Sequence, residues 1–131
     1  MRTEIQLLAC SIALGLAHVL VAVIVATKQK GRAWNMGNRE GDNVPLAGLA
    51  FRLEQASGNF KETFPFFAAA VLALSFLQKG NFSTELGAHL YFWARLAYLP
   101  IYGAGIVGLR SIVWTVSMVG LALVLAGIFL A

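Results

Sequence analysis

Four long apolar segments, separated by polar connections, organise the chain. The first apolar run extends from Ile5 to Ala26, and at 1.5 Å per residue it is long enough to cross the roughly 30 Å hydrocarbon core of a bilayer. Polar, turn-favouring residues then continue to Pro45. The pattern predicts an all-α membrane protein, a single four-helix transmembrane bundle over residues 1–131. The predicted helices cover about 4–27, 45–78, 84–109 and 111–131.

Cap and turn signals set the later helix boundaries. The break QKGNFST ends the second apolar run, and Ser83 or Thr84 is expected to cap the next helix, with Glu85 in its first turn. Arg110 is expected in the short connection between the third and fourth segments. The third boundary is therefore predicted at about 109–111.

Composition identifies lipid as the surrounding medium. Hydrophobic residues make up 59% of the chain and charged residues 12%, against roughly 25% charged in soluble domains. The net charge of +4 comes without a basic tract, which argues against nucleic acid as a partner. The loop 28–44 carries four basic residues, Lys28, Lys30, Arg32 and Arg39. The positive-inside rule therefore predicts cytoplasmic first and third loops and both termini outside.

Two polar stripes at helical spacing carry the candidate chemistry. Residues three, four and seven apart share one face of a helix. The stripe of the second segment is Arg52, Gln55, Asn59 and Glu62, and that of the third is Arg95, Tyr98 and Tyr102, with Arg110 and Ser111 just beyond. Ionisable groups at membrane depth are costly and usually face partners or a polar cavity. Two stripes toward one side of the membrane predict a shared site.

The same residues have structural interpretations. Arg52 and Glu62 could snorkel or pair within the bundle. The two tyrosines could form an interfacial belt, and Ser111 could be a helix cap. The remaining polar or sulfur-containing residues of the apolar runs are interpreted structurally: His18 as a hydrogen-bonded packing residue, His89 as interfacial and Cys10 as a small packing residue. No His, Cys and carboxylate cluster has metal-ligand spacing, so no metal site is predicted.

The sequence resembles the MAPEG family, the membrane-associated proteins in eicosanoid and glutathione metabolism. The first shared motif is Arg52 followed by NFKE and Pro65, and the second is ARLAYLPIYGAGIVGLRSIVW. Length, four segments and a long polar-faced second helix also agree, so the resemblance covers essentially the whole chain. The stretch YLPIYGAGIVGLRSIVW is most similar to the small bacterial branch, which implies a bacterial inner-membrane protein.

This resemblance implies a homotrimer that binds glutathione between neighbouring subunits near the cytoplasmic side. It implies that Glu62 holds the glutathione amino group with support from Asn59, and that Arg110 binds a carboxylate or stabilises the thiolate. Lys28 or Lys30 is a further candidate cation. The full implied set comprises Arg52, Asn59, Glu62, Arg95 and Tyr98 for glutathione binding, with Tyr102, Arg110 and Ser111 in catalysis.

The chemistry of glutathione fits this residue set. Its two carboxylates and one ammonium call for both Arg and Glu, joined by charge-assisted hydrogen bonds. A nearby cation lowers the pKa of the attacking thiol, and a lipophilic substrate can arrive laterally from the bilayer. One position departs from the family, which usually has a second Arg three residues after the first. Here that residue is Gln55.

The sequence is consistent with three alternative functions. The first is a glutathione-dependent transferase or peroxidase acting on lipophilic electrophiles, favoured by the intact Asn59, Glu62 and Arg110. The second is a non-catalytic MAPEG-fold subunit of a larger membrane complex, favoured by Gln55. The third is a small transporter or lipid-binding module, which needs a continuous polar path across the membrane, and the outer halves of the segments look too apolar for one.

Overall fold

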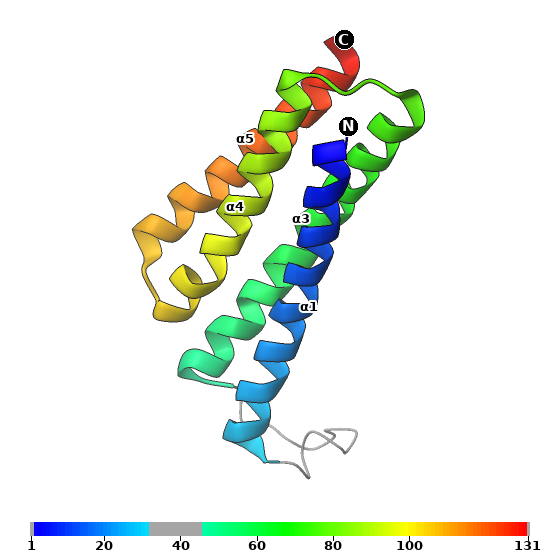
Figure 1. Cartoon of the computed structure of the whole chain (residues 1–131). Helices are drawn as coiled ribbons and strands as arrows, with labels where there is room; N and C mark the ends of the chain where they lie inside the picture. Colours follow the sequence, from blue (N-terminus) through cyan, green and yellow to red (C-terminus); the bar gives the residue numbers. More distant parts are fainter. Residues whose placement is uncertain (1, 32–45, 131) are drawn as a thin grey trace.

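The computed structural model describes residues 2–31 and 46–130, and this part of the chain is almost entirely helical. Its helices are α1 (Arg2–Lys30), α3 (Gly48–Leu77), α4 (Phe82–Ala104) and α5 (Val107–Leu130). They run up and down alternately, so the start of α1, the α3–α4 turn and the end of α5 lie at one end (Figure 1). The α4–α5 turn lies toward the opposite end, where α1 finishes and α3 begins.

Three of these helices are long and apolar enough to cross a membrane, namely α1, α3 and α5. At 1.5 Å per residue the 23 residues of α4 span about 34 Å, which is also sufficient length. Its polar stripe makes it less apolar than the others, and it packs most extensively along α5. The prediction of an all-α, four-helix protein is confirmed for the described part of the chain, in which three of the four predicted transmembrane helices are candidate membrane spans.

The boundary between the third and fourth helices falls earlier than predicted. Helix α4 ends at Ala104, and Gly105 follows in the left-handed region with φ of 78°. Its backbone N–H donates to the carbonyls of Ile101 and Tyr102, which satisfies acceptors that a helix end leaves open. Arg110 therefore lies near the start of α5 and not in the connection, and its N–H donates to the Ile106 carbonyl.

The start of α4 uses a different cap from the one predicted. The N-cap is Asn81, whose side chain accepts from the Thr84 backbone N–H, while Thr84 Oγ1 accepts from the Asn81 N–H. This reciprocal pair is a capping box. Thr84 is thus part of the cap at its third position, Ser83 instead donates to the Leu123 carbonyl, and Glu85 occupies the first turn as predicted.

Small residues bring α4 and α5 into close contact. A Cβ atom at Gly120 would lie 2.6 Å from both the Gly87 carbonyl oxygen and the Tyr91 nitrogen. Such a spacing has no room for any side chain, and it is the packing typical of helices that associate inside membranes. The line Ser117, Gly120, Val124 and Gly127 forms the buried face of α5.

Aromatic and aliphatic side chains from all four helices fill the core. Phe67 of α3 stacks on Tyr91 of α4 with ring centroids 4.2 Å apart, and the buried Tyr91 hydroxyl shares a 3.0 Å hydrogen bond with Thr63. The indole, phenol and hydroxyl groups of a core need such partners. In contrast to the prediction, Cys10 is exposed and does not pack within the subunit.

Polar contacts close the bundle at its two ends. Near the start of α1, the buried carboxylate of Glu4 accepts a 2.7 Å hydrogen bond from Thr84 Oγ1, and Asn81 Nδ2 donates to the Gly127 carbonyl. At the opposite end, the side chain of Gln29 bonds both the N–H and the carbonyl of Ala47. Each end of the bundle is therefore held by hydrogen bonds between residues far apart in the chain.

Candidate functional site

The stripe of α4 and the start of α5 form a column in which two adjacent aromatic rings lie between two cations. The guanidinium carbon of Arg95 lies 4.1 Å from the centroid of the Tyr98 ring, and Tyr98 lies 5.4 Å from Tyr102. The guanidinium carbon of Arg110, from α5, lies 4.7 Å from the Tyr102 ring. These spacings are within the range of cation–π attraction. Four of the predicted site residues are therefore brought together in one line, named here the Arg–Tyr column.

The left-handed turn after α4 makes this arrangement possible. Gly105 reverses the chain so that the first turns of α5 run back beside the last turn of α4. Arg110 then reaches the ring of Tyr102, although the two residues lie on different helices. A positive charge near a helix N-terminus opposes the helix dipole, and the contact with the electron-rich Tyr102 face offsets that cost.

Arg95 of the Arg–Tyr column is buried without a hydrogen-bond partner in the described chain. Its exposed fraction is 0%, and its three nitrogen atoms have no hydrogen-bond partner within residues 2–31 and 46–130. Besides Tyr98, its guanidinium approaches the ring of Phe60, at 5.6 Å. Cation–π contacts replace only part of the hydration that a buried charge loses. The guanidinium therefore keeps hydrogen-bond donors without acceptors in the described part of the chain.

Two residues extend the column toward α1 and were not part of the predicted site. Phe60 of α3 stacks on His18 of α1, with centroids 4.9 Å apart. His18 is a packing residue, as predicted, but neither ring nitrogen has a hydrogen-bond partner in the described ranges. Phe60 lies one position beyond Asn59, so the polar stripe of α3 and this aromatic contact belong to adjacent faces of the helix. A lone His in an apolar run gave no indication of this position.

Arg52 is a structural arginine in this fold. Its Nε–H donates a 2.8 Å hydrogen bond to the Gly103 carbonyl, one of the last carbonyls of α4, which a helix end leaves without an intrahelical donor. A Cβ atom at Gly105 would lie 3.6 Å from Nε of the same side chain. Arg52 thus ties α3 to the α4 terminus and holds the turn that positions Arg110.

Of the other residues in the α3 stripe, two face outward and one is half-buried. Gln55 and Glu62 are exposed, and within the described ranges no hydrogen bond or ion pair joins Glu62 to the Arg–Tyr column. Asn59 is half-buried, and its buried Oδ1 has no hydrogen-bond partner in the described chain. Within the described residues of this chain, the exposed end of the α3 stripe therefore does not join the Arg–Tyr column.

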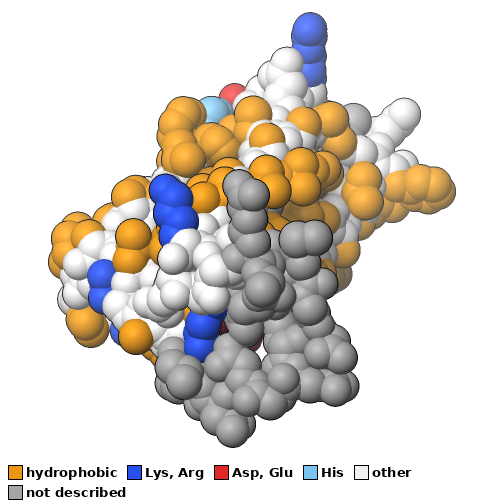
Figure 2. Space-filling view, turned by 90° about the horizontal axis from the view of Figure 1, so that it is seen from below, with side chains coloured by type: hydrophobic (Ala, Val, Ile, Leu, Met, Phe, Trp, Pro, Cys, Tyr) orange, Lys and Arg blue, Asp and Glu red, His pale blue; other side chains and the backbone are white. Residues whose placement is uncertain are grey.

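Ser111 and the lysines lie outside the Arg–Tyr column. The Ser111 hydroxyl donates to the Val107 carbonyl within α5 and its side chain is exposed, so it is not the helix cap. Lys28 and Lys30 lie in the last turn of α1, where cations complement the helix dipole. Figure 2 views this end of the molecule and shows Lys and Arg side chains across it, among hydrophobic ones. Residues 32–45, with Arg32 and Arg39, lie outside the described part.

The described residues contain no group of three His, Cys, Asp or Glu side chains that could hold a metal ion. The helices and the Arg–Tyr column together define an all-helical protein with three candidate membrane spans and a buried cationic site near the α4–α5 turn. A model of the MAPEG family matches residues 7–130, and the chain belongs to this family. A search of curated proteins and a search of solved structures found no match.

Proposed function

We propose that this MAPEG protein is a glutathione-dependent transferase or peroxidase that acts on lipophilic electrophiles in the bilayer. The observation that carries the proposal is Arg95, a fully buried cation whose three nitrogen atoms have no partner in the described chain. An uncompensated charge at membrane depth is rare and usually marks a functional site. A carboxylate of a bound anion would complete it through charge-assisted hydrogen bonds.

The residues around Arg95 fit glutathione. Arg95 and Arg110 are cations suited to its two carboxylates or its thiolate, and the phenols of Tyr98 and Tyr102 can donate hydrogen bonds. The buried Oδ1 of Asn59 is an acceptor without a donor in the described chain. The ammonium group of glutathione is a donor that could bind it. These groups supply two cations, two phenol donors and a neutral acceptor, and the negative charge that the ammonium of glutathione requires would come from Glu62.

Different residues would stabilise the thiolate, orient it and bind a carboxylate of glutathione. When bound, glutathione supplies the thiolate that forms a carbon–sulfur bond to the electrophile as the leaving group departs. Arg110, half-buried on the Tyr102 ring, would hold an adjacent sulfur in its anionic form because a nearby cation stabilises a thiolate. Tyr102 would orient the same group by a hydrogen bond, and Arg95 would anchor a carboxylate away from the reacting atom.

A homotrimer forms part of this proposal. Gln55 and Glu62 are exposed on the subunit, although α3 is a candidate membrane span. A carboxylate facing lipid at that depth is strongly disfavoured. Burial against a neighbouring copy, beside the half-buried Tyr102 and Arg110 of that copy, would give Glu62 polar surroundings and would extend the Arg–Tyr column into an intersubunit site. The basic end of the molecule would then be the cytoplasmic end.

One residue favours a second function, a non-catalytic MAPEG subunit of a larger membrane complex. Gln55 stands where the family usually has a second arginine, and it is exposed. Arg52, whose Nε is engaged at the end of α4, is then the single cation of the α3 stripe. Affinity for the carboxylates of glutathione would rest on fewer cations than the family usually has.

Calorimetric titration of the purified protein with glutathione tests the proposed function. We expect Glu62→Gln to weaken binding by about 2–5 kcal/mol, as for loss of one partner of a buried charge pair, on the order of 30-fold or more. Glu54→Gln is the matched control, because Glu54 is an exposed acid of the same helix outside the stripe. Gln55→Arg should tighten binding. Conjugation of 1-chloro-2,4-dinitrobenzene reports turnover.

The outcomes separate the two functions. Glutathione binding with turnover supports the transferase. Binding that Glu62→Gln leaves unchanged contradicts the role of Glu62. If neither the wild type nor Gln55→Arg binds millimolar glutathione, the accessory subunit becomes the better account.

A further inference from the structure

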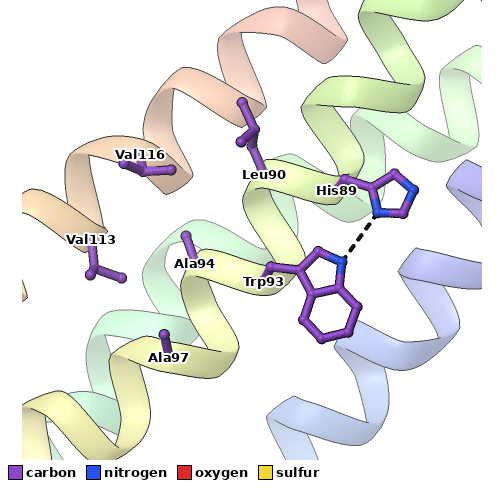
Figure 3. Close-up of a pocket in the computed structure, with 7 residues that line it drawn as sticks. All are labelled: His89, Leu90, Trp93, Ala94, Ala97, Val113 and Val116. Carbon is purple, nitrogen blue, oxygen red and sulfur yellow. Dashed lines mark hydrogen bonds between the residues drawn. The ribbon is translucent and has the colours of Figure 1, made fainter.

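A groove between α4 and α5 has features of a second binding site, separate from the Arg–Tyr column. It has a volume of about 230 Å³ and is lined by His89, Leu90, Trp93, Ala94, Ala97, Val113 and Val116. Figure 3 shows His89 and Trp93 on one side, Val113 and Val116 of α5 on the other, and the small side chains of Ala94 and Ala97 between them. The two alanines leave the hollow that a larger residue would fill.

The shape of the groove favours a narrow apolar ligand. Pockets for drug-sized molecules begin at roughly 300 Å³, and this groove is smaller. From His89 to Ala97 it follows α4 for eight residues, or about 12 Å of helix rise. Its walls, apart from His89 and the indole N–H, are hydrocarbon, and Trp93 at 56% exposure and Val116 at 36% face outward. Because α5 is a candidate membrane span, the groove opens toward bilayer hydrocarbon.

One polar group remains at the rim. The indole Nε1–H of Trp93 donates a 3.1 Å hydrogen bond to Nδ1 of His89. Since Nδ1 accepts, a neutral His89 ring carries its proton on Nε2. No residue of the described chain accepts from that Nε2–H. In hydrocarbon an unmade hydrogen bond is costly, so an oxygen acceptor from a ligand would stabilise the site.

We propose that this groove binds one acyl chain of a membrane phospholipid, whose ester carbonyl oxygen accepts the hydrogen bond of His89 Nε2–H. His89 lies about 10 Å of helix rise from the start of α4, and helical side chains lean toward the N-terminus. The imidazole therefore lies near the end of the helix, where ester groups of a bilayer are found. From there the groove descends along α4 in the direction that an acyl chain takes.

This site does not depend on the glutathione proposal. Arg95 is fully buried on the inner side of α4, while the groove is on the outer side, toward α5 and lipid. An acyl chain in the groove would make dispersion contacts with the side chains of both helices, and these contacts are lost wherever a gap remains. It would also satisfy the imidazole donor.

Quenching of tryptophan fluorescence by a brominated lipid tests the proposal. The Trp34→Phe/Trp114→Phe variant retains Trp93, and the Trp34→Phe/Trp93→Phe variant retains Trp114, which is exposed on α5 but outside the groove. Each is placed in phosphatidylcholine vesicles with increasing amounts of phosphatidylcholine brominated near the ester end of its acyl chain. We expect Trp93 quenching to saturate at a low fraction of brominated lipid, whereas Trp114 quenching rises in proportion to that fraction.

Two further variants identify the occupant. Ala97→Leu fills the groove and should return Trp93 quenching to the proportional behaviour of Trp114. His89→Phe should lower retention of phosphatidylcholine in native mass spectrometry by about fivefold, the equivalent of one hydrogen bond. Circular dichroism confirms that each variant is folded.

Other results would overturn the proposal. Equal, proportional quenching of both tryptophans, unchanged by Ala97→Leu, would mean ordinary contact with bulk lipid. Protection of Trp93 from quenching would mean that protein, such as a second copy of the chain, covers the groove. Saturable quenching by free brominated fatty acid but not by the phospholipid would assign the groove to a different ligand.

Discussion

Replacing Gly120 by alanine tests the close contact between α4 and α5. The added Cβ would lie 2.6 Å from the Gly87 carbonyl oxygen and from the Tyr91 nitrogen, and 2.9 Å from the Leu90 Cβ. Two of these atoms are backbone, so they can move only if the helices separate. Overpacking of this kind costs roughly 1–3 kcal/mol, and three contacts favour the upper end. The better helix propensity of alanine stabilises the folded protein by about 1 kcal/mol. We expect a net loss of about 2 kcal/mol.

Thermal unfolding in a mild detergent, followed by circular dichroism, measures this loss. A decrease of about 2 kcal/mol corresponds to a fall in Tm of roughly 5–10 °C. Gly108→Ala is the control on the same helix, because a Cβ there meets nothing within 4 Å, and it should leave the stability unchanged or raise it by up to about 1 kcal/mol. If Gly120→Ala is as stable as Gly108→Ala, the helices do not pack at this distance and the described α4–α5 contact is wrong.

Three further predictions follow from the fold and the site. Tyr91→Phe should lower stability by about 1 kcal/mol, because it removes the buried hydrogen bond to Thr63; denaturation of the single variant checks this. Without glutathione, Arg95→Met should raise stability by roughly 1–2 kcal/mol, since it relieves an uncompensated buried charge at the expense of its ring contacts; a lower Tm would mean that Arg95 already has its partner. A cysteine at Asn38, which lies outside the described residues, should resist labelling from outside intact cells, and ready labelling would reverse the topology.

Helical spacing predicted the Arg–Tyr column well. Arg95, Tyr98 and Tyr102 share a face by spacing alone, and their rings and guanidinium do lie in one line. The position of Arg110 could not be derived in the same way. It depends on the left-handed backbone of Gly105, which ends α4 five residues earlier than the apolar pattern suggested.

The stripe of α3 exposes a limit of periodicity. Spacing placed Arg52, Gln55 and Glu62 on one face but could not say what that face meets. The apolar face, with Phe60 and Phe67, takes the core because it gains most from burial. The polar face therefore turns outward, where only a ligand or another chain can cover it.

Buried polar residues of α1 were the hardest to predict. His18 and Glu4 are each 1% exposed, yet a single polar residue in an apolar helix gives the same sequence signal whether it faces lipid, water or protein. Their partners, Phe60 and Thr84, lie on other helices and far along the chain. Only the tertiary arrangement identifies them.

Glutathione-dependent thermal stabilisation of the wild type and of Arg95→Met tests the central claim, that the buried arginine completes a glutathione site. A ligand that binds only the folded protein stabilises it by about 2.7 kcal/mol at 100 times its Kd. We predict that millimolar glutathione raises the Tm of the wild type and leaves the Tm of Arg95→Met unchanged. No shift in the wild type, or an equal shift in both proteins, would contradict the account.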